Sequence, residues 1–273
     1  MEAGDGRLKT YIEGFDRILE GGIPTGHIVL VAGTPGTMKS SISYYMLYNH
    51  AIESKRTSVY VTLEQSRESL LRQMEKMGMD IDKVSENLNV LDLSIIRKKL
   101  KEIAGGTSWL HVFKTYITNL KQNLNFDILV IDSMEVLETM AEIRNRRTDL
   151  FYLFEWMRDL GVTVFLISES SAERLIEGKF DEGYLSDGII TLKMQLIRDV
   201  EMQRRIRCVK MRETNHDPSY YSLLYNDGRF QVTRVISERS DASPSQQVRM
   251  PPLRFRSATG GHAVRPMRRG PET

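Results

Sequence analysis

Residues 33–41 read GTPGTMKSS and come close to the phosphate-loop pattern G-x-x-x-x-G-K-[ST]. Lys39 stands at the lysine position, where the motif predicts contact with the β- and γ-phosphates of a nucleotide. Ser40 stands at the hydroxyl position, where the motif predicts contact with Mg²⁺. Met38 replaces the glycine of the motif but keeps the backbone N–H that contacts phosphate. The replacement costs little at negative φ and roughly 1–2 kcal/mol at positive φ. The loop alone leaves three interpretations: a working nucleotide site, a degenerate one, or a chance match.

The segments on either side of the loop favour a working site. Residues 27–33, HIVLVAG, form a short apolar run that ends in glycine and is typical of a buried strand. A helix pattern then runs from Ser40 to about residue 53. A phosphate loop needs this order, because the free N–H groups at the start of a helix bind the anion. The sequence therefore predicts a nucleotide site between this strand and this helix.

Two carboxylates are candidates to complete the site. Asp132 ends the apolar stretch DILVIDS (127–133), at the carboxyl end of a predicted strand, where α/β sheets bind ligands. We expect Asp132 to support the magnesium ion; the alternative is that it only caps the next helix. Glu64 ends SVYVTLE (58–64) and is the candidate general base for attack of water on the γ-phosphate. Glu64 would lie next to the phosphate loop if its strand neighbours the strand before the loop.

Apolar strands alternate with helices over most of the chain, which implies an α/β fold with a mainly parallel sheet and helices on both faces. From Gly188 on, strands follow one another without helices, and Asn226-Asp227-Gly228 is a hairpin signal. We therefore expect a C-terminal antiparallel β extension. The strands expected in the parallel core cover residues 27–33, 58–64, 88–94, 127–133 and 163–170.

Capping residues mark the helices between these strands. Ser66 is expected to cap a helix that Gly78 ends. Two helices should follow the third strand, separated by Gly105-Gly106, with Ser108 as the cap of the second. A longer helix is expected to end at Leu160-Gly161.

Composition sets broad limits. The chain has 273 residues, of which 41% are hydrophobic and 27% are charged, enough for a single α/β domain. Its net charge of +2 favours no class of partner. Cys208 is the only cysteine, which excludes an intrachain disulfide, and the five histidines lack metal-ligand spacing. No apolar run approaches the length of a membrane span, so no membrane contact and a cytoplasmic location are expected.

The last stretch differs in character. Residues 237–273 hold seven arginines, no lysine, three acidic residues and five prolines, for a net charge of +4. Such a segment buries too little apolar surface to offset its ordering entropy. We expect a domain over residues 1–236 followed by a disordered basic tail, which is either a solvated end or a contact for nucleic acid or an acidic partner.

The chain resembles the KaiC family, within the RecA-like group of P-loop ATPases. Four stretches carry the resemblance and cover nearly all of residues 7–236 in the family's order: GFDRILEGGIPTGHIVLVAGTPGTMKSS, SVYVTLEQSRESLL, FDILVIDSMEVL and RRIRCVKMRETNHDPSYYSLLYNDG. The resemblance implies a RecA-like P-loop core, ATP with Mg²⁺ as the bound species, and a homo-oligomer in the form of a hexameric ring.

The resemblance also implies roles for single residues of one subunit. Glu64 matches the first of two adjacent catalytic glutamates, and Gln65 stands where the second is expected, which removes one charge. Asp132 matches the magnesium-associated aspartate. Ser168 and Glu169 lie where the family has a segment that senses the γ-phosphate. The phosphate cradle is matched by Gly36, Thr37, Met38, Lys39, Ser40 and Ser41.

A last segment is implied to act on the neighbouring subunit of a ring. Lys210 and Arg212 are expected to reach the nucleotide of that neighbour, accompanied by Met211, Thr214 and His216. Being two apart on a predicted strand, Lys210 and Arg212 should point to the same side, with Met211 on the other.

Three functions remain open on the sequence. The first is a slowly hydrolysing ring ATPase that relays its nucleotide state to an unidentified partner protein. The second is a recombinase-related DNA-binding ATPase, for which IRNRRTD (143–149) and the arginine-rich tail are the candidate contacts. The third is a nucleotide sensor with little or no turnover, which Met38 and Gln65 together suggest.

Overall fold

The structure is a computed structural model that describes residues 6–93, 108–141, 143, 145–170 and 182–235. These residues belong to one compact unit that extends to Val235. The predicted tail over 237–273 and the first of the two helices predicted after the third strand lie outside the described residues.

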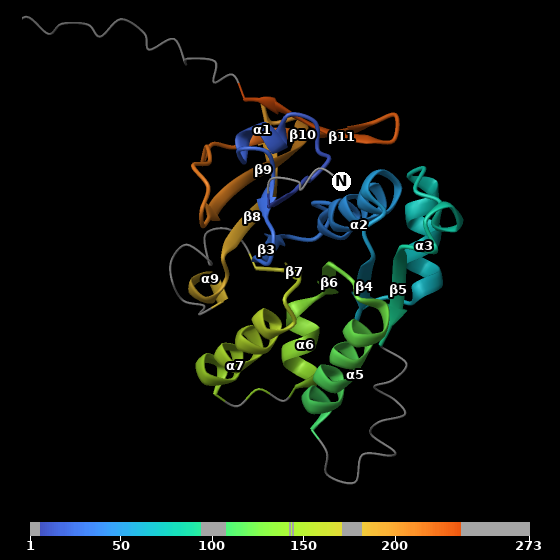
Figure 1. The fold of residues 1–273 in the computed structure, drawn as a ribbon. Helices are drawn as coiled ribbons and strands as arrows, with labels where there is room; N and C mark the ends of the chain where they lie inside the picture. Colours follow the sequence, from blue (N-terminus) through green and yellow to red (C-terminus); the bar gives the residue numbers. More distant parts are fainter. Residues whose placement is uncertain (1–5, 94–107, 142, 144, 171–181, 236–273) are drawn as a thin grey trace, which may run out of the picture. The chain divides into compact units, whose positions relative to one another are not determined.

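The core is a nine-stranded sheet in the order β11-β10-β9-β8-β3-β7-β6-β4-β5 (Figure 1). Strands β3 to β8 run parallel to one another, and the pairs β8–β9, β9–β10 and β10–β11 are antiparallel. The parallel strands are β3 (Ile28–Gly33), β4 (Ser58–Thr62), β5 (Leu88–Asp92), β6 (Ile128–Asp132), β7 (Thr163–Ser168) and β8 (Gly188–Ile197). The others are β9 (Glu201–Met211), β10 (Tyr221–Asn226) and β11 (Arg229–Arg234).

This topology confirms the mainly parallel sheet with a C-terminal antiparallel extension and corrects two details. Strand β8, the first strand expected in the antiparallel part, pairs antiparallel with β9 as predicted, but it also pairs in parallel with β3 and so belongs to both parts of the sheet. Strands β3 and β4, which flank the phosphate loop and Glu64 in sequence, are not neighbours, because β7 and β6 lie between them. The sequence pattern identifies buried strands but carries no information on their order.

Helices cover both faces of the sheet, as two separate groups of buried side chains show. One face packs against α2 (Lys39–Asn49) and α3 (Arg67–Lys76). The other packs against α5 (Trp109–Leu124), α6 (Met134–Met140) and α7 (Arg146–Asp159). The Ser66 cap is confirmed, since its hydroxyl accepts a hydrogen bond from the Ser69 N–H. Shorter elements are α1 (Phe15–Ile18), α9 (Glu182–Leu185), η2 (Ile81–Lys83) and the paired strands β1 (Arg7–Leu8) and β2 (Ile23–Pro24).

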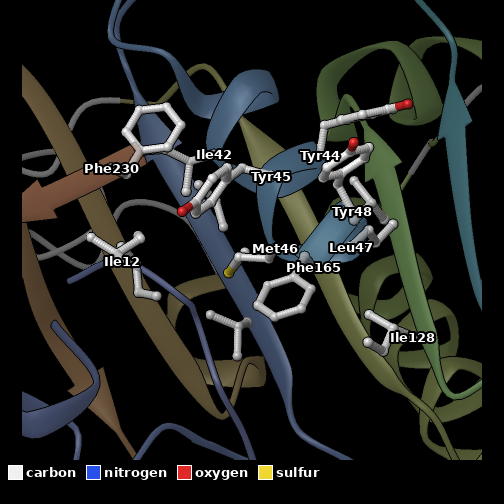
Figure 2. Packing of buried hydrophobic residues seen from close by; sticks show 14 of the residues in the cluster. Ile12, Ile42, Tyr44, Tyr45, Met46, Leu47, Tyr48, Ile128, Phe165 and Phe230 are labelled. Carbon is white, nitrogen blue, oxygen red and sulfur yellow. The ribbon is translucent and has the colours of Figure 1, made fainter. Parts of the chain in front are cut away.

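Helix α2 is buried along most of its length, which fixes its first turn relative to the sheet. Tyr45 packs edge-on against Phe230 of β11, with ring centroids 5.1 Å apart, and Tyr44 lies on the side of β6 (Figure 2). The helix predicted to reach residue 53 ends at Asn49 and continues as a π-helical turn, η1 (His50–Ser54). In that turn the buried His50 ring bonds the Lys9 carbonyl through Nε2 at 2.8 Å, and the turn ends α2.

Candidate functional site

The loop between β3 and α2 is held closed by its own backbone and by Thr37. The Thr37 side chain is buried, and its hydroxyl donates to the Thr34 carbonyl at 2.8 Å. Gly33 must lack a side chain, because a Cβ there would lie 2.3 Å from the Leu192 carbonyl oxygen of β8. Gly36 has a φ of 81°, a conformation that favours glycine. The loop therefore has the tight, glycine-dependent turn that a phosphate cradle requires.

Met38 adopts the left-handed conformation, with φ 73° and ψ 27°, at the N-cap of α2. The structure thus answers the question left open by the sequence: the position is one that favours glycine, and methionine is strained there by roughly 1–2 kcal/mol. Its side chain packs against the core under α2, and its carbonyl accepts the Ile42 N–H at 2.9 Å. The loop keeps its shape despite the replacement.

Lys39 lies over the loop and is surrounded by carboxylates. Its ammonium donates to the Gly33 carbonyl at 2.7 Å and to the Thr34 carbonyl at 3.3 Å. Burial lowers the pKa of Lys39, while four nearby carboxylates act in the opposite direction: those of Glu169, Asp132, Glu135 and Glu64. A phosphate group is therefore expected to replace the two carbonyls as the partner of this cation.

Asp132 ends β6 on the face of the sheet that α2 covers, and only 5% of its surface is exposed. The Tyr60 hydroxyl of β4 donates to Asp132 Oδ2 at 2.6 Å. Burial raises the pKa of the Asp132 carboxyl, whereas hydrogen bonds with Tyr60 and Ser40 lower it. Ser40 therefore lies near enough to Asp132 to lower the pKa of its carboxyl.

These two residues fit a magnesium ion by the chemistry of their donor atoms. Mg²⁺ prefers oxygen ligands and is usually held by one or two carboxylates together with substrate phosphates and water. The hydroxyl of Ser40 and the carboxylate of Asp132 supply such oxygens beside the loop. Among the described residues no group of three or more His, Cys, Asp or Glu side chains is placed to hold a metal ion.

Glu64 lies at the carboxyl end of β4 and is exposed. The Ser133 hydroxyl donates to Glu64 Oε1, which ties it to the segment that follows Asp132. The turn that carries Glu64 is closed by Thr62, whose hydroxyl donates to the Gln65 carbonyl at 2.8 Å. Although β4 does not neighbour β3, Glu64 still reaches the site, because the adjacent strands β4 and β6 end at the same level, Thr62 pairing with Asp132.

Glu135 is a site residue that sequence reasoning missed. It lies in the first turn of α6, and its Oε1 accepts hydrogen bonds from the Ser168 hydroxyl at 2.7 Å and the Glu169 N–H at 2.8 Å. Glu135 therefore fixes the end of β7 against α6 and holds Glu169 near Lys39. The only signal in the sequence is its position three residues after Asp132.

Two adjoining grooves follow the outer side of α2 and α3. The first, of about 550 Å³, is lined by Tyr45, Asn49, Lys76, Met77, Gly78, Tyr225, Asp227, Gly228 and Arg229. The second, of about 430 Å³, shares Lys76 and Met77 and continues along α3 to Ser69, Arg72 and Gln73. Gln73 Nε2 lies 3.5 Å from the hydroxyl of Ser41, which connects the second groove to the first turn of α2. On the β9 side, Arg204 Nε donates to the Gly36 carbonyl at 3.3 Å.

Lys210 and Arg212 contact the segment around α9 of their own chain. The Lys210 ammonium donates to the carbonyls of Ser186 at 2.6 Å and Gly183 at 3.1 Å. The Arg212 guanidinium pairs with Asp187 Oδ1 at 2.5 Å. The two cations share a side, as predicted, although β9 ends at Met211 and Arg212 lies beyond it.

The three companions of these cations are placed apart from the phosphate loop. Met211 is buried in the core under α2, pointing away from Lys210. Thr214 lies in the loop after β9, where its hydroxyl accepts a hydrogen bond from Arg7 at 2.9 Å. The His216 ring lies 3.3 Å from the Thr214 carbonyl. No contact among the described residues joins them to the phosphate loop of the same chain, whereas Lys39, Ser40, Asp132 and Glu64 lie near one another.

The remaining predictions from single residues are mixed. Cys208 is buried in the core, as expected. Arg146, in the stretch considered for DNA contact, is instead paired with Glu138 and Glu182, each at 2.8 Å. In the part of the chain that the structure describes, no helix has the length and apolar character needed to cross a membrane.

Comparisons with known proteins show the family and the fold of the chain. The family described as "ATPase: KaiC" matches residues 8–234. A UPF0273 protein of Methanocaldococcus jannaschii is 32% identical over 222 residues, covering 77% of this chain and 89% of that protein. A solved KaiC-like protein of Pyrococcus horikoshii superposes with a TM-score of 0.70 at 28% identity, covering 84% of this chain and 99% of that one.

A circadian clock relative matches only in part. The circadian clock oscillator protein KaiC of Synechococcus elongatus is 28% identical over 232 residues, which is 81% of this chain but 43% of the relative. The chain thus spans less than half the length of that clock protein.

Proposed function

The chain belongs to the KaiC family of ATPases, and from that premise we propose that it binds ATP with Mg²⁺, hydrolyses it slowly and works as a ring. The observation that carries the proposal is the convergence of Lys39, Ser40, Asp132 and Glu64 from three separate elements. Chance rarely brings a lysine, a hydroxyl and two carboxylates to the end of a parallel sheet beside a glycine-dependent loop.

Each side chain has a distinct role in the proposed reaction. Lys39 leaves the loop carbonyls and binds the β- and γ-phosphates, and the N–H groups from Gly36 to Ser41 cradle them. Ser40 and Asp132 would hold a magnesium ion, which would neutralise charge on the phosphates. Glu64, oriented by the Ser133 hydroxyl, positions the attacking water and accepts its proton.

The nucleotide base is proposed to lie in the groove beside α2 and α3. The larger groove is lined by Lys76, Tyr225 and Asp227, and the adjoining smaller groove reaches Gln73, which contacts Ser41 in the first turn of α2. A volume of about 550 Å³ is within the range of small-molecule sites. An aromatic side chain next to charged groups suits a flat, polar base.

Lys210 and Arg212 are proposed to act on the nucleotide of the next subunit, with Thr214 and His216 beside them. To do so they must leave the Ser186 carbonyl and the Asp187 carboxylate. The active unit would be a closed ring with heterologous interfaces, in which each subunit offers different surfaces to its two neighbours. The rearrangement around α9 would give a partner protein a way to read the nucleotide state.

The test is release of phosphate from ATP by the purified chain with Mg²⁺, with and without single-stranded DNA, and light scattering under the same conditions. We expect slow, DNA-independent release that Lys39→Ala abolishes, and a larger particle when ATP is present. Strong stimulation by DNA would favour the recombinase-related function. ATP binding without release of phosphate would favour a nucleotide sensor, the function that the strained Met38 and the glutamine at position 65 suggest.

A further inference from the structure

The Tyr60 hydroxyl lies at the junction of the three elements that form the magnesium-binding part of the site. Tyr60 is fully buried in the middle of β4, and its hydroxyl donates to Asp132 Oδ2 at 2.6 Å. Hydrogen bonding with Ser40 affects both of these groups. The hydroxyls of Tyr60 and Ser40 therefore meet at one carboxylate, with one hydroxyl coming from β4 and the other from α2.

The strand register explains why Tyr60 is the residue that reaches Asp132. In the parallel pair of β4 and β6, Tyr60 stands opposite Val130 and Thr62 stands opposite Asp132. Tyr60 and Asp132 are thus diagonal neighbours on the face that α2 covers, within reach of a long aromatic side chain. The Tyr60 ring packs against the Tyr44 ring of α2, with ring centroids 5.9 Å apart.

The geometry points to Tyr60 as a positioning residue for magnesium. With Oδ2 engaged by Tyr60, the Asp132 carboxylate keeps one orientation when Ser40 turns from the carboxylate to the metal. Residues that orient metal-binding side chains typically change metal affinity by about 10–100-fold when they are replaced. This inference rests on the proposed function, since it assigns a role in the same nucleotide site.

The chain offers a matched control next to Tyr60. Tyr44 is also a fully buried tyrosine, and its hydroxyl has no hydrogen-bond partner among the described residues. Replacing either tyrosine by phenylalanine removes one buried hydroxyl and keeps the ring. Only the change at Tyr60 removes a contact with Asp132, so the two variants separate positioning of the carboxylate from loss of a buried oxygen.

The experiment measures affinity for a fluorescent ATP analogue in EDTA and over a series of Mg²⁺ concentrations. We expect Tyr60→Phe to raise the Mg²⁺ concentration for half-maximal tightening by about tenfold, with affinity in EDTA unchanged. Tyr44→Phe should match the wild type in both measurements. Thermal unfolding of each variant reports whether the fold is retained.

A double-mutant cycle keeps the inference testable if Tyr60→Phe is less stable. In an Asp132→Asn background, Tyr60→Phe should have no further effect on the Mg²⁺ dependence, because it acts through the carboxylate. The inference is overturned if Tyr60→Phe and Tyr44→Phe have the same Mg²⁺ dependence. It is also overturned if Tyr60→Phe weakens binding of the analogue in EDTA as much as it weakens binding in Mg²⁺. If the nucleotide affinity of the wild type did not change with Mg²⁺ concentration, the proposed function itself would be overturned.

Discussion

Two groups of charged side chains are proposed to act on the nucleotide, one at the phosphate loop and one at the end of β9, and they differ in how many partners each already has in this chain. Near the phosphate loop, the Asp132 carboxylate acts on the charge of Lys39, and Lys39 donates hydrogen bonds to two backbone carbonyls that a phosphate could replace. At the end of β9, Lys210 and Arg212 are already satisfied by three carbonyls and a carboxylate around α9. Under the proposed function, one chain could bind a nucleotide by exchanging the carbonyl partners of Lys39, whereas turnover would also require Lys210 and Arg212 to leave their present partners.

The largest expected effect is a loss of nucleotide affinity when the lysine of the phosphate loop is replaced. Lys39→Ala removes the cation that would pair with the phosphates and should weaken Mg-ATP binding by roughly a hundredfold or more. Isothermal titration calorimetry measures it, with Lys210→Ala as the control that should still bind. Unchanged affinity in Lys39→Ala would remove the loop from the account.

A second substitution distinguishes binding from chemistry within the same group. Glu64→Gln keeps the acceptor for the Ser133 hydroxyl but cannot take a proton, so ATP should stay bound while turnover falls by about a hundredfold or more. Single-turnover phosphate release with measured nucleotide affinity gives both numbers. Turnover equal to that of the wild type would show that another group activates the water.

The loss of folding stability at acid pH should depend on His50, which follows α2, the helix that begins with Lys39 and Ser40. Burial lowers the pKa of His50 to about 4 from its usual 6.5, so the folded state favours the neutral ring. The unfolded chain binds the proton first, and stability is therefore lost as pH falls from about 6.5 towards 4, by about 3 kcal/mol. Denaturant unfolding across this range should show the loss, and His50→Gln should flatten the curve. An identical slope in the variant would assign the effect to other groups.

The smallest expected effect concerns the strained residue of the loop. Met38→Gly relieves roughly 1–2 kcal/mol of backbone strain and loses the packing of a half-buried side chain. Because these terms oppose each other, nucleotide affinity should stay the same or improve slightly, as calorimetry would show. A large loss of affinity would mean that the methionine itself is needed for the shape of the loop.

Much of this arrangement is readable in the sequence, because the signals are local. Continuous apolar runs such as 127–133 identify buried parallel strands, and Ser66 marks a helix start that the structure confirms. Lys39, Ser40 and Asp132 follow from the motif and from strand ends. The φ of Met38 does not, since it depends on how the loop closes against β8.

Other features depend on strand order, which no local pattern contains. From the sequence, Glu64 would lie next to the loop if β3 and β4 were neighbours; β7 and β6 lie between them, and Glu64 instead contacts Ser133, which follows β6. Tyr60 reads as an ordinary strand residue, and Glu135 as an ordinary first-turn acid. Their roles appear only when the register of β4 with β6, and the packing of α6 on β7, are known.

The most direct test of the central claim, that the two groups act on one nucleotide from different subunits, is a mixing experiment. Arg212→Ala and Glu64→Gln should each bind ATP and turn it over poorly. Mixed in equal amounts, they should regain activity, because about a quarter of heterologous interfaces would pair an intact Glu64 with an intact Arg212. Phosphate release from the mixture above that of either parent is the predicted result. A mixture as inactive as its parents, although light scattering shows mixed assemblies, would contradict the account.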